Sequence, residues 1–257
     1  MPKQLNVFVA IPAGDGKLYV ETVESLMQEF LHGLSENVIV MPSIVSGNSI
    51  LPRARNSLVA TFLASGCDVM VFVDSDVSWP VGTLTKLAQI DEDIVGMAYR
   101  GRCDPEQYAM RWAKNQELWA NSKGLIEVEG LPTGFLKISR RCLEDLVAKN
   151  PDLAYNDDGC PDGTAWRLFD FVQVGRDYFG EDIWFGLFAA KHGYKSYLYP
   201  EATLSHTGAK KFTGNIGDWL RTRMMRDIIA PQEGENINEQ IRSIEEAYVP
   251  VDAVPQN

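Results

Sequence analysis

Short apolar stretches alternate along the chain with longer segments whose apolar residues recur at helical spacing. Residues 5–11, 38–41, 69–73 and 94–99 are short runs of mainly large apolar residues, which is typical of strands in a parallel sheet. Residues 19–34 are predicted to form a helix packed on that sheet through its apolar side chains. These side chains are Val23, Leu26, Met27, Phe30, Leu31 and Leu34. The pattern therefore predicts an α/β protein.

Turn residues divide the rest of the chain. Pro52 stands in the first turn of a predicted helix over residues 49–65. Residues 150–164 are rich in Asp, Asn, Gly and Pro, so they are predicted to form an exposed, mobile loop. Residues 130–141 are interpreted as a turn, a strand and the start of a helix ending at 149. The other predicted elements are helices at 80–89, 180–190, 217–229 and 236–248, a strand at 193–200 and a disordered tail at 250–257.

The apolar run at residues 69–73 ends abruptly in Asp74, Ser75 and Asp76. In open α/β sheets ligands bind in the crevice outside the carboxyl ends of the strands, so these acids stand where chemistry is expected. Side chains alternate along a strand, and residues 74 and 76 are therefore expected to point the same way and to converge on one cation. A hard divalent ion with oxygen ligands suits such a pair.

Four marks occur in order along the chain: Ala54-Arg55-Asn56, the Asp-x-Asp of residues 74–76, Gly180-Glu181-Asp182 and His206. Together they resemble the nucleotide-sugar glycosyltransferases of the GT-A fold, in the family-two-like and Anp1-like groups that include relatives in phages and large viruses. The resemblance covers residues 4–212. It implies a Rossmann-like α/β fold with a mixed, mostly parallel central sheet flanked by helices.

The same resemblance implies a donor site for a UDP- or GDP-linked sugar. The loop after the first strand would hold the base and ribose, the Ala-Arg-Asn helix would face the donor, and a glycine would let substrate approach the backbone. The alternatives are a plain turn after that strand and a solvated first turn for the helix. The residues implied are Pro12, Ala13, Arg55, Asn56, Asp74, Ser75, Asp76, Gly134 and Lys210.

Two acids open the predicted helix at residue 180. By resemblance, Asp182, or less favourably Glu181, is the base that deprotonates the acceptor hydroxyl in an inverting reaction. The helix dipole alone would also stabilise acids in a first turn, which is the simpler explanation. A His-x-Gly followed by lysine, beginning at His206, resembles retaining enzymes instead. The stereochemical outcome is therefore left open.

A metal site is expected at Asp74, Asp76 and His206, because a neutral imidazole completes a site with two aspartates. The ion would be Mn²⁺ or Mg²⁺ on the donor diphosphate. A loop histidine bonded to the backbone is the alternative for His206. Asp157 and Asp158 form a less favoured second candidate for a cation site, since exposed loop acids are usually just solvated.

Two further groups of residues have open interpretations. Arg100 and Arg102 follow the strand at 94–99 and are either phosphate contacts or surface charge. The aromatic residues Tyr108, Trp112 and Trp119 either stack on sugar or pack in the core, and core packing is commoner for such residues.

The composition narrows the function. The chain has 257 residues and a formal net charge of −11, which argues against a nucleic-acid partner or a basic membrane-binding face. A relative that glucosylates DNA bases is disfavoured for the same reason. The four cysteines show no pairing pattern, and reduced thiols in a cytoplasmic protein are expected. No signal peptide or membrane span is expected.

The sequence thus predicts a metal-dependent glycosyltransferase that moves a sugar to a hydroxyl acceptor, such as a glycan. Residues 1–215 would form the catalytic domain and 216–257 a helical extension and tail. One alternative is a nucleotidyltransferase acting on sugar phosphates, but the glycine-rich, lysine-bearing loop of such enzymes is not found after the first strand. The other is a GT-A module that binds sugar nucleotide or glycan without catalysis.

Overall fold

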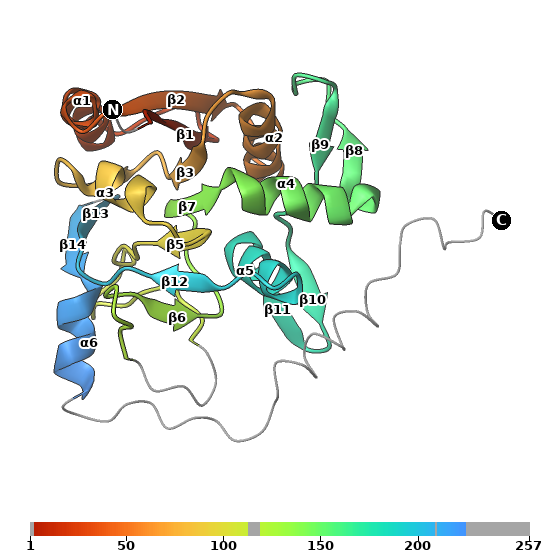
Figure 1. The fold of residues 1–257 in the computed structure, drawn as a ribbon. Coiled ribbons are helices and arrows are strands. Elements are labelled where there is room, and N and C mark those ends of the chain that lie inside the picture. Colours follow the sequence, from red (N-terminus) through yellow and green to blue (C-terminus); the bar gives the residue numbers. More distant parts are fainter. Residues whose placement is uncertain (1–2, 113–118, 209, 225–257) are drawn as a thin grey trace.

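The computed structural model describes residues 3–112, 119–208 and 210–224, and its centre is a seven-stranded sheet (Figure 1). Strands β1, β2, β3, β5 and β12 run parallel, whereas β7 and β6 run against them. The predicted α/β fold with a mixed, mostly parallel sheet is therefore confirmed. In spatial order the strands are β2 (Val38–Ser46), β1 (Leu5–Ala13), β3 (Val69–Val73), β7 (Phe135–Ser139), β5 (Ile94–Gly96), β12 (Ser196–Leu198) and β6 (Ile126–Val128).

Helices cover both faces of this sheet, because successive side chains of a buried strand point to opposite sides. Val7, Val9 and Ile11 of β1 pack in the core on the side of α1 and α3, whereas Phe8 and Ala10 pack with α2, α4 and α5. The helices are α1 (Val20–Ser35), α2 (Leu51–Ala64), α3 (Thr83–Gln89), α4 (Arg140–Lys149) and α5 (Glu181–Lys191).

Three smaller sheets lie around the central one (Figure 1). Their strands are β8 (Ala154–Asn156) with β9 (Thr164–Trp166), β10 (Val172–Val174) with β11 (Asp177–Phe179), and β4 (Val77–Ser78), β13 (Thr203–Thr207) and β14 (Lys211–Asn215). A 3-10 turn η1 (Pro151–Leu153) and the helix α6 (Ile216–Met224) complete the described elements. The predicted helix at 236–248 and the tail at 250–257 lie outside the described residues.

Helix α1 forms where it was predicted, but the expected packing face is wrong. Met27, Leu31 and Leu34 are 61%, 74% and 64% exposed, and only Leu26 of the predicted apolar face is fully buried. The buried face instead carries mostly small and polar residues, among them Glu29, which has no exposed surface.

Glu29 determines that orientation because its carboxylate satisfies donors from the next layer. Its Oε2 accepts from the Trp79 indole at 3.1 Å and from the Gly82 amide at 3.0 Å, and its Oε1 accepts from the Thr85 amide at 2.8 Å. Two of these donors are backbone amides at the start of α3, which lack partners within their own helix. A buried charge satisfied in this way ties α1 to the segment following β4.

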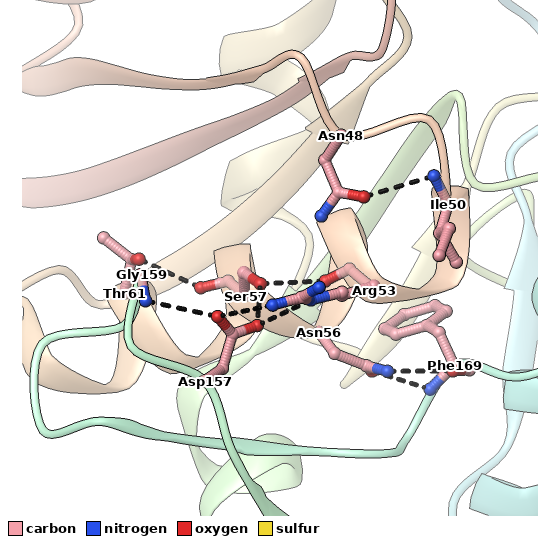
Figure 2. Close-up of polar contacts among 9 residues, drawn as sticks. All are labelled: Asn48, Ile50, Arg53, Asn56, Ser57, Thr61, Asp157, Gly159 and Phe169. Atoms are coloured by element: carbon pink, nitrogen blue, oxygen red, sulfur yellow. Dashed lines mark hydrogen bonds and ion pairs between the residues drawn. The ribbon is translucent and has the colours of Figure 1, made fainter.

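Residues 150–164 form η1 and the β8–β9 hairpin, so the prediction of a loop without regular elements is wrong, although many of these residues are exposed as predicted. Asp157 is buried and accepts from Arg53 at 3.2 Å and from Ser57 at 3.1 Å, both on α2 (Figure 2). Asn56, one residue before Ser57, holds the backbone of Phe169 through two 2.9 Å hydrogen bonds. Helix α2 thereby anchors the chain between β8 and β10. Asp157 is committed to this contact and not to a cation.

Among the described residues, no helix combines the length and apolar character needed to cross a membrane.

Candidate functional site

The candidate site begins where β3 ends at Val73. Asp74 to Val77 form a turn, closed by the Val77 amide donating to the Asp74 carbonyl at 3.1 Å. Residues 74 and 76 were expected to point the same way because the strand was assumed to continue through them. The strand ends at Val73, so the alternation of side chains does not apply to these two residues. The two carboxylates instead enter two different clusters.

Asp74 belongs to a cluster with Arg55, Tyr99 and Gly134. Its Oδ1 accepts from Arg55 Nη2 at 3.0 Å, and its Oδ2 accepts from the Tyr99 hydroxyl at 3.2 Å. A Cβ added at Gly134 would lie 2.6 Å from Asp74 Oδ2 and 2.5 Å from Tyr99 Cε1. The absence of a side chain at position 134 therefore makes room for these two protein groups.

Arg55 joins this cluster to the start of α5. Its side chain is 2% exposed, and its Nε lies 3.3 Å from Glu181 Oε1. Burial disfavours the charge, but Asp74 and then Glu181 outweigh it, so the pKa of Arg55 is raised. Among the described residues, its Nη1 is buried without a hydrogen-bond partner. Arg55 therefore positions two acids and leaves the hydrogens of Nη1 unused.

Asp182 follows Glu181 in the first turn of α5. Its Oδ1 accepts from the Ile183 amide at 2.7 Å. Burial, and then the charge of Glu181, raise the pKa of the Asp182 carboxyl. A carboxylate that binds its proton more tightly than usual is better suited to act as a base.

Asp76 and His206 form the second cluster. His206 Nε2 lies 3.4 Å from Asp76 Oδ1. Strand β13 brings the histidine there by pairing with β4, in a register that sets His206 opposite Val77. The Thr207 amide also donates to the Asp76 carbonyl at 2.8 Å. His206 is therefore a strand residue held beside the aspartate, and not a loop histidine.

The contacts of His206 define its tautomer. Nδ1 lies 3.2 Å from the Arg100 carbonyl, which can only accept, so Nδ1 carries the hydrogen. Burial, and then the positive charge of Arg102, lower the pKa of the imidazole. In the neutral ring with a protonated Nδ1, the Nε2 lone pair faces the Asp76 carboxylate. A proton or a metal ion shared by these two acceptors would stabilise the pair.

Tyr99 connects the two clusters. Its hydroxyl binds Asp74, and its ring packs edge-on against the His206 imidazole with a centroid distance of 4.9 Å. Burial, and then Asp74, raise the pKa of Tyr99 well above its usual value, so it stays a neutral donor. Sequence reasoning missed this residue. The available signal was its position at the carboxyl end of the predicted strand at 94–99, the same edge as Asp74.

Part of the predicted metal site supplies ligands that suit a divalent ion. No group of three His, Cys, Asp or Glu side chains able to hold a metal occurs within the described parts of the chain. Asp74 directs both oxygens to protein donors, which leaves Asp76 and His206 as a two-ligand set. Mg²⁺ commonly binds through one or two carboxylates plus substrate phosphates and water. A histidine that binds a metal through one ring nitrogen commonly donates the other N–H to a carbonyl, which is the contact that Nδ1 of His206 makes.

Arg102 competes for the same aspartate. Its guanidinium pairs with Asp76 Oδ2, and the arginine side chain is 42% exposed. A Cβ added at Gly208 would lie 2.9 Å from Arg102 Cδ, so this glycine leaves space for the arginine to lie along the site. Of the two arginines weighed from sequence, Arg102 is the one that enters the site by its side chain.

The remaining predicted residues lie in different places. Pro12 and Ala13 are buried in the last two positions of β1, where a loop was expected, and the Ser75 carbonyl accepts from the Tyr19 amide at 2.9 Å. Asn56 is used on Phe169, as described above. Lys210 donates to Asp104 at 2.7 Å on the surface. Among the described residues, none of these five forms a side-chain hydrogen bond or ion pair with either acid cluster.

The aromatic residues weighed from sequence do not form one wall. Tyr108 packs edge-on against Trp219 of α6, and Trp112 packs against the core. Trp119 is 66% exposed.

Comparisons with known proteins address the fold. No protein-family description matches the sequence, and no curated protein matches it. Among solved structures, A197 from STIV is similar over 90% of this chain and 100% of that chain, with a TM-score of 0.51 and 17% identity. GalNAc-T7, solved with UDP, GalNAc and Mn²⁺, is similar over 80% of this chain and 44% of its own, with a TM-score of 0.47 and 14% identity. S. aureus TarS, solved with UDP, follows with a TM-score of 0.37, 13% identity and coverage of 76% of this chain and 57% of that chain. The likeness to A197 shows a shared fold.

Proposed function

We propose that this protein is a glycosyltransferase that moves a sugar from a nucleoside-diphosphate donor, UDP- or GDP-linked, to a hydroxyl acceptor. The observation that carries the proposal is the pairing of Asp76 with His206 at 3.4 Å, at the carboxyl end of a central strand. Ligands bind outside this end of open α/β sheets. The GT-A resemblance of the sequence motifs supports the same assignment.

Asp76 and His206 would hold Mn²⁺ or Mg²⁺ on the donor diphosphate. When bound, the ion neutralises the charge that develops on the leaving diphosphate. Arg102, already in this cluster and 42% exposed, would turn toward the phosphates. Asp74 keeps Arg55 and Tyr99 in place and is a positioning residue in this account, not a metal ligand.

Asp182 is the candidate base. In an inverting reaction its carboxylate removes the proton from the acceptor hydroxyl as that oxygen bonds to the sugar carbon. Glu181 is less suited, because it is paired with the buried Arg55. In a retaining reaction no such base is needed, and Asp182 would position the sugar instead.

The test is a transfer and hydrolysis assay over UDP- and GDP-linked sugars with Mn²⁺ or Mg²⁺, using the wild type and the Asp76→Asn and His206→Ala variants. We expect the wild type to release nucleoside diphosphate. We expect kcat to fall at least 10²-fold in the variants, as for other groups that stabilise transition-state charge. Wild-type turnover of sugar phosphates with nucleoside triphosphates, and not of nucleotide sugars, would instead establish a nucleotidyltransferase. Binding of donor without any turnover would indicate a binding module.

A further inference from the structure

The β10–β11 hairpin presents two stacked aromatic rings to solvent. Phe171, just before β10, and Tyr178 on β11 are 47% and 68% exposed. Their ring centroids lie 6.1 Å apart with an interplanar angle of 17°. Two parallel exposed rings offer flat apolar surface on which the face of a ligand can pack.

The hairpin geometry sets the direction of these rings. Val172 pairs with Phe179 in register, and Phe179 is buried, so that face of the hairpin packs inward. Side chains alternate along a strand, and Tyr178 therefore points to the opposite, outer face. Gly175, with φ of +59°, occupies the first position of the two-residue turn, where glycine is favoured in a type II′ hairpin.

The outer face of the hairpin lies toward Asp182, the candidate base. Gly180 has extended backbone, with φ of −68° and ψ of 160°, and is two residues beyond Tyr178, so both residues face the same side. A Cβ added at Gly180 would lie 3.0 Å from Asp182 Oδ1. Two residues of extended chain place Gly180 about 7 Å from Tyr178, and the Asp182 carboxylate lies beside Gly180 on the side from which Tyr178 projects.

We propose that Phe171 and Tyr178 form the acceptor platform of the site and that the acceptor is a carbohydrate. This inference rests on the proposed function and adds the class of acceptor and its place. A sugar ring has an apolar C–H face that packs on an aromatic ring, and its hydroxyls can use the phenol of Tyr178 as donor or acceptor. The platform would guide one acceptor hydroxyl toward Asp182.

The local charge favours a neutral sugar over a polyanion. The charged neighbours on the hairpin are Asp170, Arg176 and Asp177, two acids and one base. Nucleic acid also stacks on aromatic rings, but it requires a positively charged track for its phosphates.

Saturation-transfer NMR on the full chain tests the platform with maltotriose, cellotriose and chitotriose, and with free nucleosides as the competing class. The account expects at least one trisaccharide to bind the wild type, and its affinity to fall at least tenfold in a Phe171→Ala/Tyr178→Ala double variant. Tyr178→Phe, which keeps the ring, should retain most of the affinity. Leu31→Ala removes an apolar side chain that is 74% exposed on α1 and should change nothing.

Equal saccharide affinity in the double variant, binding of no trisaccharide, or stronger binding of nucleosides would overturn the platform. UDP binding with Mn²⁺, measured by calorimetry on the same variants, separates the two proposals. The double variant should bind UDP like the wild type. Saccharide binding that depends on the two rings, without any nucleotide binding by the wild type, would remove the transferase and leave the platform.

Discussion

The two oxygens of the Asp76 carboxylate face two different groups, His206 and Arg102. One oxygen faces the His206 lone pair, and the other pairs with Arg102. An arginine and a divalent ion neutralise the same carboxylate, so the ion has to compete with the guanidinium. The competition is modest, because partly exposed ion pairs contribute only about 0–1 kcal/mol.

Replacing Arg102 by alanine should therefore tighten Mn²⁺ binding a few-fold in the absence of donor. Calorimetric titration with Mn²⁺ measures the change. Arg141→Ala, which removes an exposed arginine paired with Asp93, is the matched control and should leave the affinity unchanged. Weaker Mn²⁺ binding by the Arg102 variant would contradict the competition.

Asp182→Asn should lower kcat by about 10²- to 10⁴-fold, the usual contribution of a general base. The base must be deprotonated, and burial and Glu181 raise its pKa. Activity should therefore fall with decreasing pH at a value above the ordinary aspartate pKa of about 4. Initial rates across pH measure this acid limb. Asp162→Asn, at an exposed position before β9, is the control. Near-normal turnover with intact donor binding would exclude Asp182 as the base.

Gly134→Ala should disturb the site from within. The new methyl would meet Tyr99 and the Asp74 carboxylate at 2.5–2.6 Å, so both must shift. Overpacking of this kind costs about 1–3 kcal/mol. Urea unfolding and kcat/KM should both show the defect. Gly66→Ala, where an added Cβ meets nothing within 4 Å, should show neither. A Gly134 variant with wild-type kinetics would show that the Asp74–Tyr99 contact is dispensable.

The sequence motifs predicted that Asp76, His206, Asp182 and Arg55 share one region. Asp76 follows a strand, Arg55 and Asp182 stand near the starts of helices, and His206 lies within β13. They did not predict how the acids divide between partners. That division depends on the turn after Val73, and a single sequence does not show where a strand ends. Tyr99 was missed because a tyrosine at a strand end carries no motif of its own.

At the level of elements, α2 is the anchor for two segments far along the chain. Through Arg53, Ser57 and Asn56 it holds Asp157 and the backbone of Phe169 (Figure 2). Phe169 in turn stacks on Phe185 of α5 with a centroid distance of 4.5 Å. Helix α5 carries Glu181 and Asp182. The placement of the base therefore depends on contacts made by α2.

Asp157→Ala should destabilise the fold, because it leaves buried donors without an acceptor, at a cost of about 1–3 kcal/mol. The melting temperature should fall by several degrees. Asp158→Ala removes the neighbouring exposed acid and should have little effect, within about 0.5 kcal/mol. Equal melting temperatures for the two variants would show that the α2 anchor contributes nothing.

Composition misled the prediction for two elements. Residues 150–164 look like a loop because turn residues dominate, but β8 and β9 pair there and the buried Asp157 accepts hydrogen bonds from α2. In α1 the apolar stripe predicted the buried face, yet the three donors satisfied by Glu29 hold a neighbouring face inward, which shares only Leu26 with that stripe. Tertiary hydrogen bonds decided both cases, and periodicity does not register them.

At the scale of the whole molecule, the β4–β13 pairing places a late segment of the chain beside the turn that follows β3. This pairing creates the Asp76–His206 site, and sequence distance alone gives no hint of its register. The chain carries a net charge of −11. An anionic donor is therefore expected to bind well only when a cation enters with it.

The most direct test of this account is the thermal stabilisation of the protein by UDP and GDP with and without Mn²⁺. Ligand at about 100 times its Kd should stabilise the folded state by about 2.7 kcal/mol, which raises the melting temperature by about 5–10 °C. We predict this rise only when nucleotide and Mn²⁺ are both present, and its loss in His206→Ala and Asp76→Asn. A rise of the same size in those two variants, or with nucleotide alone, would contradict the assignment of Asp76 and His206 as the cation site.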